Sequence, residues 1–129
     1  MADWEDVLRI GLTLPEVEEA PSYRGSPALK VVGRPVCRLW SQHEHERDDV
    51  NDGEVVVVFC DPEAKEALIE ASEGALFESP HHAGHGAVLI NLADVDLDDL
   101  RMQLAWSYRL RAPKRLVRLL DEGRPAAQR

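Results

Sequence analysis

The chain has 129 residues, of which 44% are hydrophobic, and it carries a formal net charge of −9. This length suits one compact domain that buries its core without metal or disulfide staples, so we expect a single domain over residues 1–129. Because phosphate repels a strongly acidic protein, the charge argues against nucleic-acid binding over the whole surface. Any contact with a nucleic acid must therefore be local.

The charge is divided unevenly along the chain. Residues 1–100 hold 22 acidic and 7 basic side chains, a formal −15, whereas residues 101–129 hold 8 basic and 2 acidic side chains, a formal +6. Six of these cations and no carboxylate lie between Arg101 and Leu120. The segment is either an anion-binding surface or the complement of the acidic body.

The first residues are acidic and lack the basic start and apolar stretch of a secretory signal. No apolar run approaches the ~18 residues that a membrane helix needs. We therefore expect a cytoplasmic protein that makes no membrane contact. Cys37 and Cys60 both lie in apolar, strand-like segments, where a reduced and buried thiol behaves as a small hydrophobe.

The first predicted element is a helix. Apolar residues recur at helical spacing from Trp4 to Leu12, and Asp3 is placed to cap them, so we expect an amphipathic helix that ends before Pro15. Residues 15–27 then have the composition of a loop.

Strands and a polar insertion are predicted next. We expect two short strands between Ala28 and Ser41, around Gly33-Arg34-Pro35, and a central strand over residues 53–60. Residues 42–52 (QHEHERDDVND) contain five acids and no apolar periodicity. They predict an exposed, acidic hairpin insertion between the strands.

The second half of the chain also alternates between predicted helices and strands. Asp61-Pro62 should open a helix that runs to about Ala71, since proline is favoured at the first helical position. Two strands are expected over residues 75–79 and 87–92, around a loop at 80–86.

Two helices should close the chain. The carboxylates of residues 96–99 suit a helix N-terminus, and this helix should run to Arg111. Pro113 predicts a kink or a short new helix. The order of elements indicates an α+β fold: an antiparallel sheet of about five strands, with an N-terminal helix, a middle helix and two C-terminal helices.

Several fragments, in this order, resemble the MmcQ/YjbR family of small bacterial proteins. They are residues 22–31 (SYRGSPALKV), 60–63 (CDPE), 79–85 (SPHHAGH), 105–106 (AW) and 112–116 (APKRL). The resemblance implies a CyaY-like arrangement with an antiparallel sheet, and DNA binding through a double-wing motif. This chain departs from the usual pattern in two places: residues 42–52 place acidic charge on a hairpin that would be a natural wing, and His85 stands where many members carry a tyrosine.

The C-terminal cations are the main candidates for binding. From Lys114 onward, cations fall on one side of a predicted helix and leucine and valine on the other. We therefore expect a local DNA-binding or anion-binding surface made by Arg109, Arg111, Lys114, Arg115 and Arg118. The alternative is that these cations pair with carboxylates of the body.

Lys30 and Arg38 are a second candidate anion site. If Gly33-Arg34-Pro35 forms a three-residue turn, Lys30 lies directly opposite Arg38, and two like charges in that position favour an anion between them. Tyr23 and Trp40 are expected nearby, where they could stack a base. A shift of one residue in register would dissolve the arrangement.

The helix that ends at Arg111 is apolar on two sides. One side carries Leu100, Leu104 and Tyr108, and the other carries Met102 and Trp106. Such a helix needs two partners. It lies either between the sheet and the last helix, or with Trp106 on a dimer or partner surface.

The histidines occur in two predicted loops. His81, His82 and His85 have ligand types that suit zinc or nickel, as do His43 and His45, but loop histidines are more often exposed or bonded to backbone. We expect no metal site, and treat the residue 80–86 loop with Tyr23 and Trp40 as a possible ligand pocket. We expect no cofactor.

Catalytic motifs are absent from the sequence. There is no glycine-rich phosphate loop and no G-x-S-x-G elbow, so we expect a protein that is not an enzyme. The leading hypothesis is a small protein that binds DNA through its basic C-terminal surface. The alternatives are a protein-interaction or homodimer module, in which the basic end of one subunit meets the acidic body of another, and a binder of small anions or metals.

Overall fold

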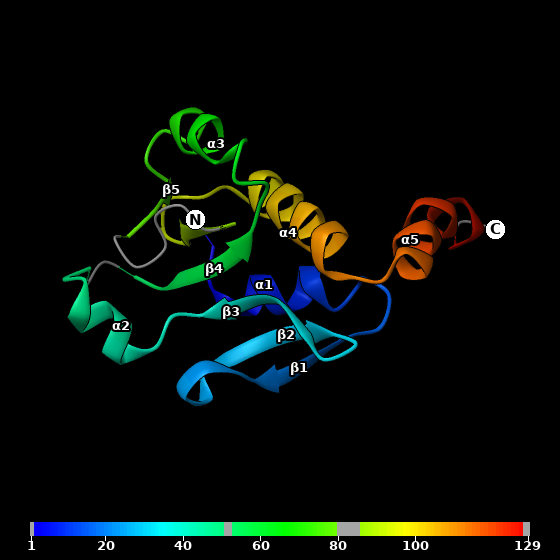
Figure 1. Cartoon of the computed structure of the whole chain (residues 1–129), viewed down its shortest axis with the longest axis horizontal. Helices are drawn as coiled ribbons and strands as arrows, with labels where there is room; N and C mark the ends of the chain where they lie inside the picture. The colour runs from blue at the N-terminus through cyan, green and yellow to red at the C-terminus, as the bar shows by residue number, and fades with distance from the viewer. Residues whose placement is uncertain (1, 51–52, 80–85, 128–129) are drawn as a thin grey trace.

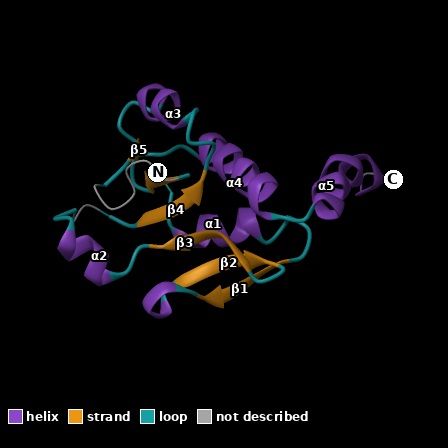
Figure 2. Cartoon of the chain, viewed as in Figure 1, coloured by secondary structure: helices purple, strands orange, loops and turns teal. Residues whose placement is uncertain are grey.

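The structure is a computed structural model of the whole chain, and it describes residues 2–50, 53–79 and 86–127. The elements follow the order α1 (Trp4–Gly11), β1 (Val17–Pro21), a short 3-10 helix η1 (Tyr23–Gly25), β2 (Pro27–Val31), β3 (Arg34–Leu39), α2 (Gln42–Arg47), β4 (Val55–Phe59), α3 (Lys65–Ala71), β5 (Leu76–Phe77), β6 (Ala87–Asn91), α4 (Leu97–Arg111) and α5 (Lys114–Ala127). Figures 1 and 2 show their arrangement.

The predicted α+β class is confirmed. All strand pairs are antiparallel, and the sheet has six strands in the order β1-β2-β3-β4-β6-β5. The prediction of about five strands missed β1, because residues 15–27 were expected to form a loop. In β1, the sequence VEEAP has only two inward positions, and its pairing with β2 from Val17 to Pro21 is set by tertiary contacts.

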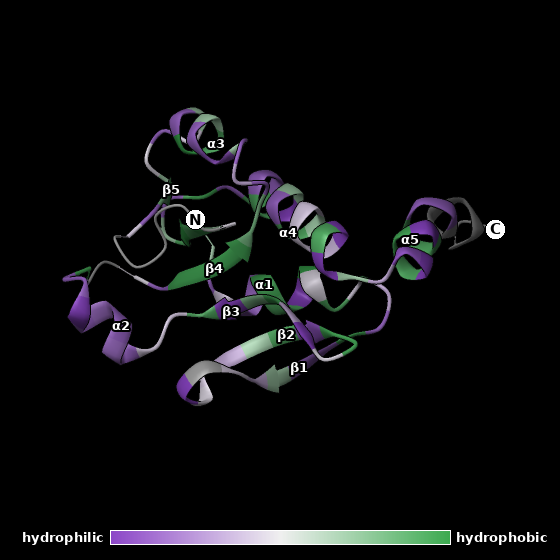
Figure 3. Cartoon of the chain, viewed as in Figure 1, coloured by the Kyte–Doolittle hydropathy of each residue, from purple (hydrophilic) through white to green (hydrophobic). Residues whose placement is uncertain are grey.

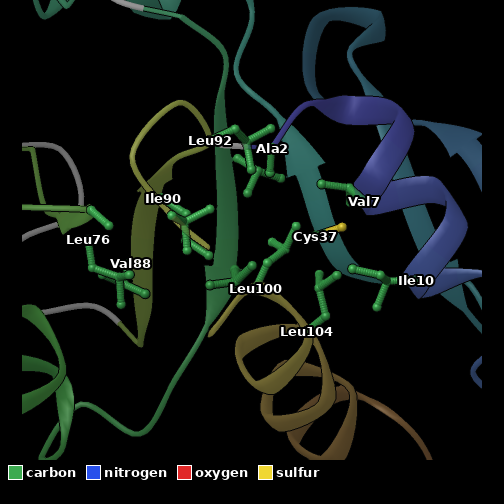
Figure 4. Close-up of a cluster of buried hydrophobic side chains, with 14 of the residues drawn as sticks. Ala2, Val7, Ile10, Cys37, Leu76, Val88, Ile90, Leu92, Leu100 and Leu104 are labelled. Carbon is green, nitrogen blue, oxygen red and sulfur yellow. The ribbon is translucent and has the colours of Figure 1, made fainter. Parts of the chain in front are cut away.

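One face of the sheet carries the main core. Side chains of α1 and α4, among them Val7, Ile10 and Leu104, pack against Cys37 and Ile90 of the strands. Figure 4 shows them pointing toward one another. The strand β4 is hydrophobic along its length in Figure 3, and β4 and β6 each carry four buried residues in succession, as burial on both faces requires.

The opposite face carries a smaller cluster. Trp40, Val55, Val57 and Leu89 are buried there, with Phe77 packed beside them.

The two cysteines are part of the core. Burial raises the pKa of the Cys37 thiol, on the main-core side, to about 12. Both cysteines are buried and free, as the sequence predicted.

The helix ends follow the local sequence. Asp3 caps α1 and Asp96 caps α4, each through a side-chain oxygen that accepts a backbone N–H three residues on. The helix α3 begins at Lys65, later than the predicted start at Pro62, because residues 62–64 form a turn.

The segment after β3 differs from the prediction. Residues 42–47 form the helix α2, which stands out as hydrophilic in Figure 3, although it was expected to be an exposed hairpin. Ser41 and Glu44 make reciprocal cap bonds at its start, and the Glu44 side chain is only 2% exposed. The expectation of full exposure is therefore wrong at Glu44.

The last two helices are separated at a proline. Ala112 has an extended backbone (φ −79°, ψ 150°), as the residue before Pro113 should. The helix α5 then projects away from the sheet, beyond the end of α4 (Figure 1). Within the part of the chain that the structure describes, no helix is long and apolar enough to cross a membrane.

Candidate nucleic-acid interface

A small apolar cluster fixes the start of α5. Leu116 is buried against Val31 and Val36 of the β2–β3 hairpin and against Tyr108 of α4. Burying one leucine side chain is worth about 2 kcal/mol. This anchor leaves the opposite side of α5 free to display Lys114, Arg115 and Arg118, all of which are exposed.

Tyr108 connects the same cluster to the segment before β1. Its hydroxyl donates a hydrogen bond to the Pro15 carbonyl oxygen at 2.8 Å. Burial, reinforced by the neighbouring Glu16 charge, raises the pKa of Tyr108, so its hydroxyl stays a donor at neutral pH. The bond holds Glu16 beside α5, where Arg115 Nη1 lies 3.2 Å from Glu16 Oε2.

Three of the C-terminal arginines have acidic partners. Arg115 pairs with Glu16, Arg109 with Asp121 of α5, and Arg101 with Asp98 at 3.6 Å. The hydrogen bond that Arg109 donates to the Asp121 carboxylate also raises the pKa of Arg109. These pairs lie at the surface, where an ion pair is worth only about 0–1 kcal/mol, so a phosphate could replace the carboxylate.

The Arg111 side chain makes contacts within the fold. Its Nε donates to the Pro35 carbonyl oxygen at 3.0 Å, and its guanidinium carbon lies 4.2 Å from the centre of the Phe59 ring. The side chain therefore ties the end of α4 to β3 and β4. A role in binding phosphate would require it to leave both contacts.

The remaining cations lie on α5 and at the tip of the β2–β3 hairpin against which Leu116 packs. Lys114 and Arg118 are one turn apart on α5, and among the described residues neither side chain makes an ion pair. Arg34 opens β3 at the tip of the β2–β3 hairpin, directly before the residue that Arg111 holds. We call Arg34, Lys114, Arg115 and Arg118 the basic corner. Sequence reasoning missed Arg34, although its place in a predicted turn marked it as exposed.

The predicted pairing of Lys30 with Arg38 across the hairpin is wrong. The register pairs Lys30 with Pro35 and Arg38 with Ala28, because a β-bulge lies between Leu29 and Lys30. The two cations therefore do not face one another. The bulge leaves both Val36 and Cys37 buried, where strict alternation would expose one of them.

Arg38 instead binds Glu44 of α2. Its two terminal nitrogens donate to the two carboxylate oxygens at 2.6 and 2.7 Å. Burial alone would raise the pKa of Glu44, but the bonds from Arg38 and the Ser41 backbone outweigh it, and the pKa lies below its ordinary value. Arg38 thus orients α2 and takes no part in the basic corner.

Trp40 does not offer a face for stacking a base. It is only 3% exposed, and its ring meets His45 and Phe77 edge to face, with centroids 5.1 and 6.2 Å away. Beside it lies a hollow of about 310 Å³ that Gln42, His45 and Glu54 also line. The Tyr23 side chain and His81, His82 and His85 lie outside the described residues, so the predicted ligand pocket has no described geometry beyond Trp40.

The residues that could hold a metal give no site in the described ranges. Among residues 2–50, 53–79 and 86–127, no group of three histidine, cysteine, aspartate or glutamate side chains gathers. His45 uses its Nδ1 in a 2.7 Å contact with the Val50 carbonyl oxygen.

Comparisons with known proteins agree with this fold. The family model YjbR matches residues 12–110. The uncharacterized proteins Rv2570 of Mycobacterium tuberculosis (strain H37Rv) and Mb2600 of Mycobacterium bovis are each 35% identical over 123 residues, which cover 91% of this chain and 94% of the relative. The crystal structure of Deinococcus radiodurans protein DR2400, with a DUF419 domain, superposes with a TM-score of 0.65 at 22% identity, covering 85% of this chain and 78% of that one.

The matched range ends at Leu110, one residue before the end of α4. The cations of α5 therefore lie beyond the family match.

Proposed function

The chain belongs to the YjbR family, and from this premise we propose that it is a non-enzymatic protein that binds nucleic acid locally, through the basic corner. The observation that carries the proposal is the projection of α5, which presents Lys114, Arg115 and Arg118 with no carboxylate before Asp121. A projecting basic helix beside a hairpin tip offers two supports for a phosphate backbone.

The size of the corner limits the affinity. Four cations that each neutralise a phosphate predict a log-log salt slope of about −3 to −4 on duplex DNA. The acidic body repels the rest of the polyanion, so we expect a dissociation constant near the nonspecific range of about 10⁻⁴–10⁻⁶ M at physiological salt. The binding should show little sequence preference, because contacts to phosphate carry no base information.

The ion pair between Arg115 and Glu16 affects how the protein would bind a phosphate. Because this pair is exposed, a phosphate can take the place of the carboxylate at small cost. Glu16 would then lie beside the bound strand and repel it. Removing the carboxylate should therefore strengthen binding, whereas reversing the charges of both Lys114 and Arg118 should abolish it.

The test is fluorescence anisotropy of a labelled duplex and a labelled single strand, titrated from low to physiological salt. The Lys114→Glu, Arg118→Glu double variant should lose binding, and Glu16→Gln should bind about 2- to 5-fold more tightly, as removal of one nearby surface charge predicts. The matched control is Arg9→Glu, Arg24→Glu, which changes the net charge equally at exposed positions elsewhere. It should retain most of the binding.

Two results would contradict the proposal. One is the absence of binding by the wild-type protein at low salt. The other is an equal loss in the control, which would show that net charge alone governs the interaction. In the first case the cations serve the protein's own acidic surface, as the pairs Arg115–Glu16 and Arg109–Asp121 already do in part.

A further inference from the structure

A groove lies between the end of α1, the length of α4 and the middle of α5, and its volume is about 760 Å³. Apolar side chains from all three helices line it, among them Ile10, Met102 and Leu119. The described lining residues include none of the basic corner. The groove is therefore a separate surface from the one proposed to bind nucleic acid.

Exposed apolar side chains gather on the helices that form this groove. Among the described residues, the large hydrophobic side chains that stay exposed belong, except for Val32, to these three helices or their ends: Leu12, Leu97, Met102, Trp106, Leu110 and Leu119. Met102 and Leu119, which line the groove itself, are 46% and 50% exposed. Apolar surface concentrated in this way on a highly charged chain is typical of a contact surface.

The floor of the groove has the length of a short helix. Its lining residues on α4 include Asp98, Met102, Ala105 and Arg109, which recur every three or four residues and so form one stripe along the helix. The stripe spans about 16 Å, because a helix rises by about 1.5 Å per residue, and three helical turns have the same length. Ala105, near the middle, is small enough to let a helix laid in the groove approach α4 closely.

The charge of the groove is opposite to that of the chain. Its lining contains three arginines, Arg9, Arg101 and Arg109, and one acidic residue, Asp98, which together give a formal +2. The whole chain carries −9. An acidic ligand is therefore attracted to the groove, whereas most of the remaining surface repels it.

The arginines have donors for a further carboxylate. Arg101 Nη1 lies 3.6 Å from Asp98 Oδ1, which is too long for a hydrogen bond, and the Asp98 side chain is 96% exposed. Arg9 and Arg109 each donate to a carboxylate that is not among the lining residues. A guanidinium has five N–H donors, so these surface pairs leave donors for a carboxylate in the groove.

The shape of the groove discriminates between acidic ligands. A small molecule is normally enclosed over about 70–90% of its surface, whereas the half-exposed Met102 and Leu119 belong to a groove that is open along one side. An amphipathic helix suits an open groove, because its apolar face enters while its polar face stays in water. Acidic residues beside the apolar face then meet the arginines.

We propose that the groove binds a helix of a protein partner, about three turns long, with apolar residues at i, i+3 or i+4, and i+7 and with aspartate or glutamate beside them. The arginines disfavour a basic helix, and the apolar floor disfavours a nucleic acid. The site acts independently of the basic corner, so the loss of either surface by substitution leaves the other in place.

The first part of the test is selection from a display library of random peptides of about 16 residues. Two baits are used in parallel, the wild-type protein and the Lys114→Glu, Arg118→Glu variant, because acidic peptides that bind the basic corner are lost from the second bait. Peptides enriched on both baits should be acidic and have the stated apolar spacing. The absence of enrichment, or enrichment of basic or extended sequences, overturns the proposal.

The second part measures the selected peptides against variants of the groove by fluorescence anisotropy. Arg9→Glu, Arg101→Glu should weaken binding by at least about 10-fold, and so should Met102→Asp, which places a charge on the apolar floor. The matched control is Lys114→Glu, Arg118→Glu, which changes the net charge as much as the first variant and should bind within about 3-fold of the wild type. Unchanged binding in either groove variant overturns the proposal.

A third selection separates charge complementarity from damage to the fold. The same library, selected on Arg9→Glu, Arg101→Glu, should yield basic amphipathic peptides, because the charge of the groove is then reversed. A variant that is folded by circular dichroism but still selects acidic helices would show that these arginines do not recognise the ligand.

Dodecanoate and a second copy of the chain are the competing occupants. Displacement of a selected peptide by dodecanoate at an equal concentration would assign the groove to a small amphipathic anion. Dimers of the wild-type protein in sedimentation equilibrium that Met102→Asp disrupts would assign it to a second copy. Either result overturns the proposed helix.

Discussion

Glu44 shows how much one buried carboxylate contributes to this fold. It accepts two hydrogen bonds from Arg38 and further bonds from Ser41, and so links α2 to β3. The S-x-x-E spacing of Ser41 and Glu44 is a recognised signature of a helix start. The five acids of residues 42–52 hid this signal, because they gave the segment the composition of an exposed loop.

Replacing Glu44 by glutamine should destabilise the protein by about 3 kcal/mol at pH 7, because the Arg38 guanidinium then remains buried without a countercharge. The folded-state pKa of Glu44 lies below its ordinary 4.5, so its contribution is present above pH 4.5 and is lost as the pH falls through the folded pKa. Urea unfolding of both proteins from pH 7 down to pH 3 should show the difference shrinking in that window.

The control is Glu46→Gln, an exposed position on the same helix, which should change the free energy of unfolding by less than about 0.5 kcal/mol. A difference between wild type and Glu44→Gln that stays constant down to pH 3 would mean that the Arg38–Glu44 pair does not titrate in the folded state as described.

At the scale of elements, Ser107 joins α4 to the sheet. The pairing of β3 with β4 ends at Cys37 and Val58, and beyond it the Ser107 hydroxyl accepts the Phe59 N–H at 2.9 Å and donates to the Val36 carbonyl. A side chain of the helix thus replaces a missing rung between two strands. Ser107 itself is fully buried.

Ser107→Ala should lower the free energy of unfolding by about 2–3 kcal/mol, because two buried backbone groups lose their partners together. Urea denaturation measures the loss, and hydrogen exchange locates it. The Phe59 amide should exchange faster relative to the Val57 amide, which lies inside the ladder. If exchange at Phe59 is unchanged relative to Val57, the hydroxyl does not serve as this rung.

The elements that sequence reasoning predicted share strong local signals. The helix α4 has an aspartate cap and ends before a proline, and β4 has four consecutive valines. The elements it missed depend on distant contacts or on a single residue. The strand β1 is formed by its pairing with β2, and the register of β2 with β3 shifts at one bulge.

Contacts between residues that are distant in the sequence also limited the prediction of the candidate site. The sequence identified the cations of the C-terminal segment, but not their partners, because Arg115 and Glu16 are 99 residues apart and Arg111 and Pro35 are 76 apart. Arg38 was removed from the site by a carboxylate six residues away, on a helix that had not been predicted. Of the predicted cations, Lys114, Arg115 and Arg118 are the ones that belong to the basic corner.

At the scale of the whole molecule, the surplus of acidic side chains produces a long-range electrostatic repulsion within the folded protein. The excess lies in the first 100 residues, and the ion pairs Arg115–Glu16 and Arg101–Asp98 offset only part of it. Repulsion between charges that are about 10–20 Å apart is screened by salt at moderate concentration, whereas direct contacts are screened less. Self-repulsion should therefore dominate the salt dependence of stability.

Raising sodium chloride from about 20 mM to about 300 mM, which shortens the screening length from about 20 Å to about 6 Å, should raise the urea midpoint of unfolding. The effect should be larger in the Lys114→Glu, Arg118→Glu variant, whose net charge is more negative. A midpoint that falls with salt would show that the ion pairs outweigh the repulsion.

The two edges of the sheet set a rule for how copies of this molecule can meet. One edge is β1, where Glu18 and Glu19 are exposed and Pro21 offers no N–H, and the other is β5, which has only two residues. Charge, proline and short length are the features that prevent strands of neighbouring chains from adding to a sheet. These features therefore disfavour edge-to-edge polymerisation of the protein into fibrils.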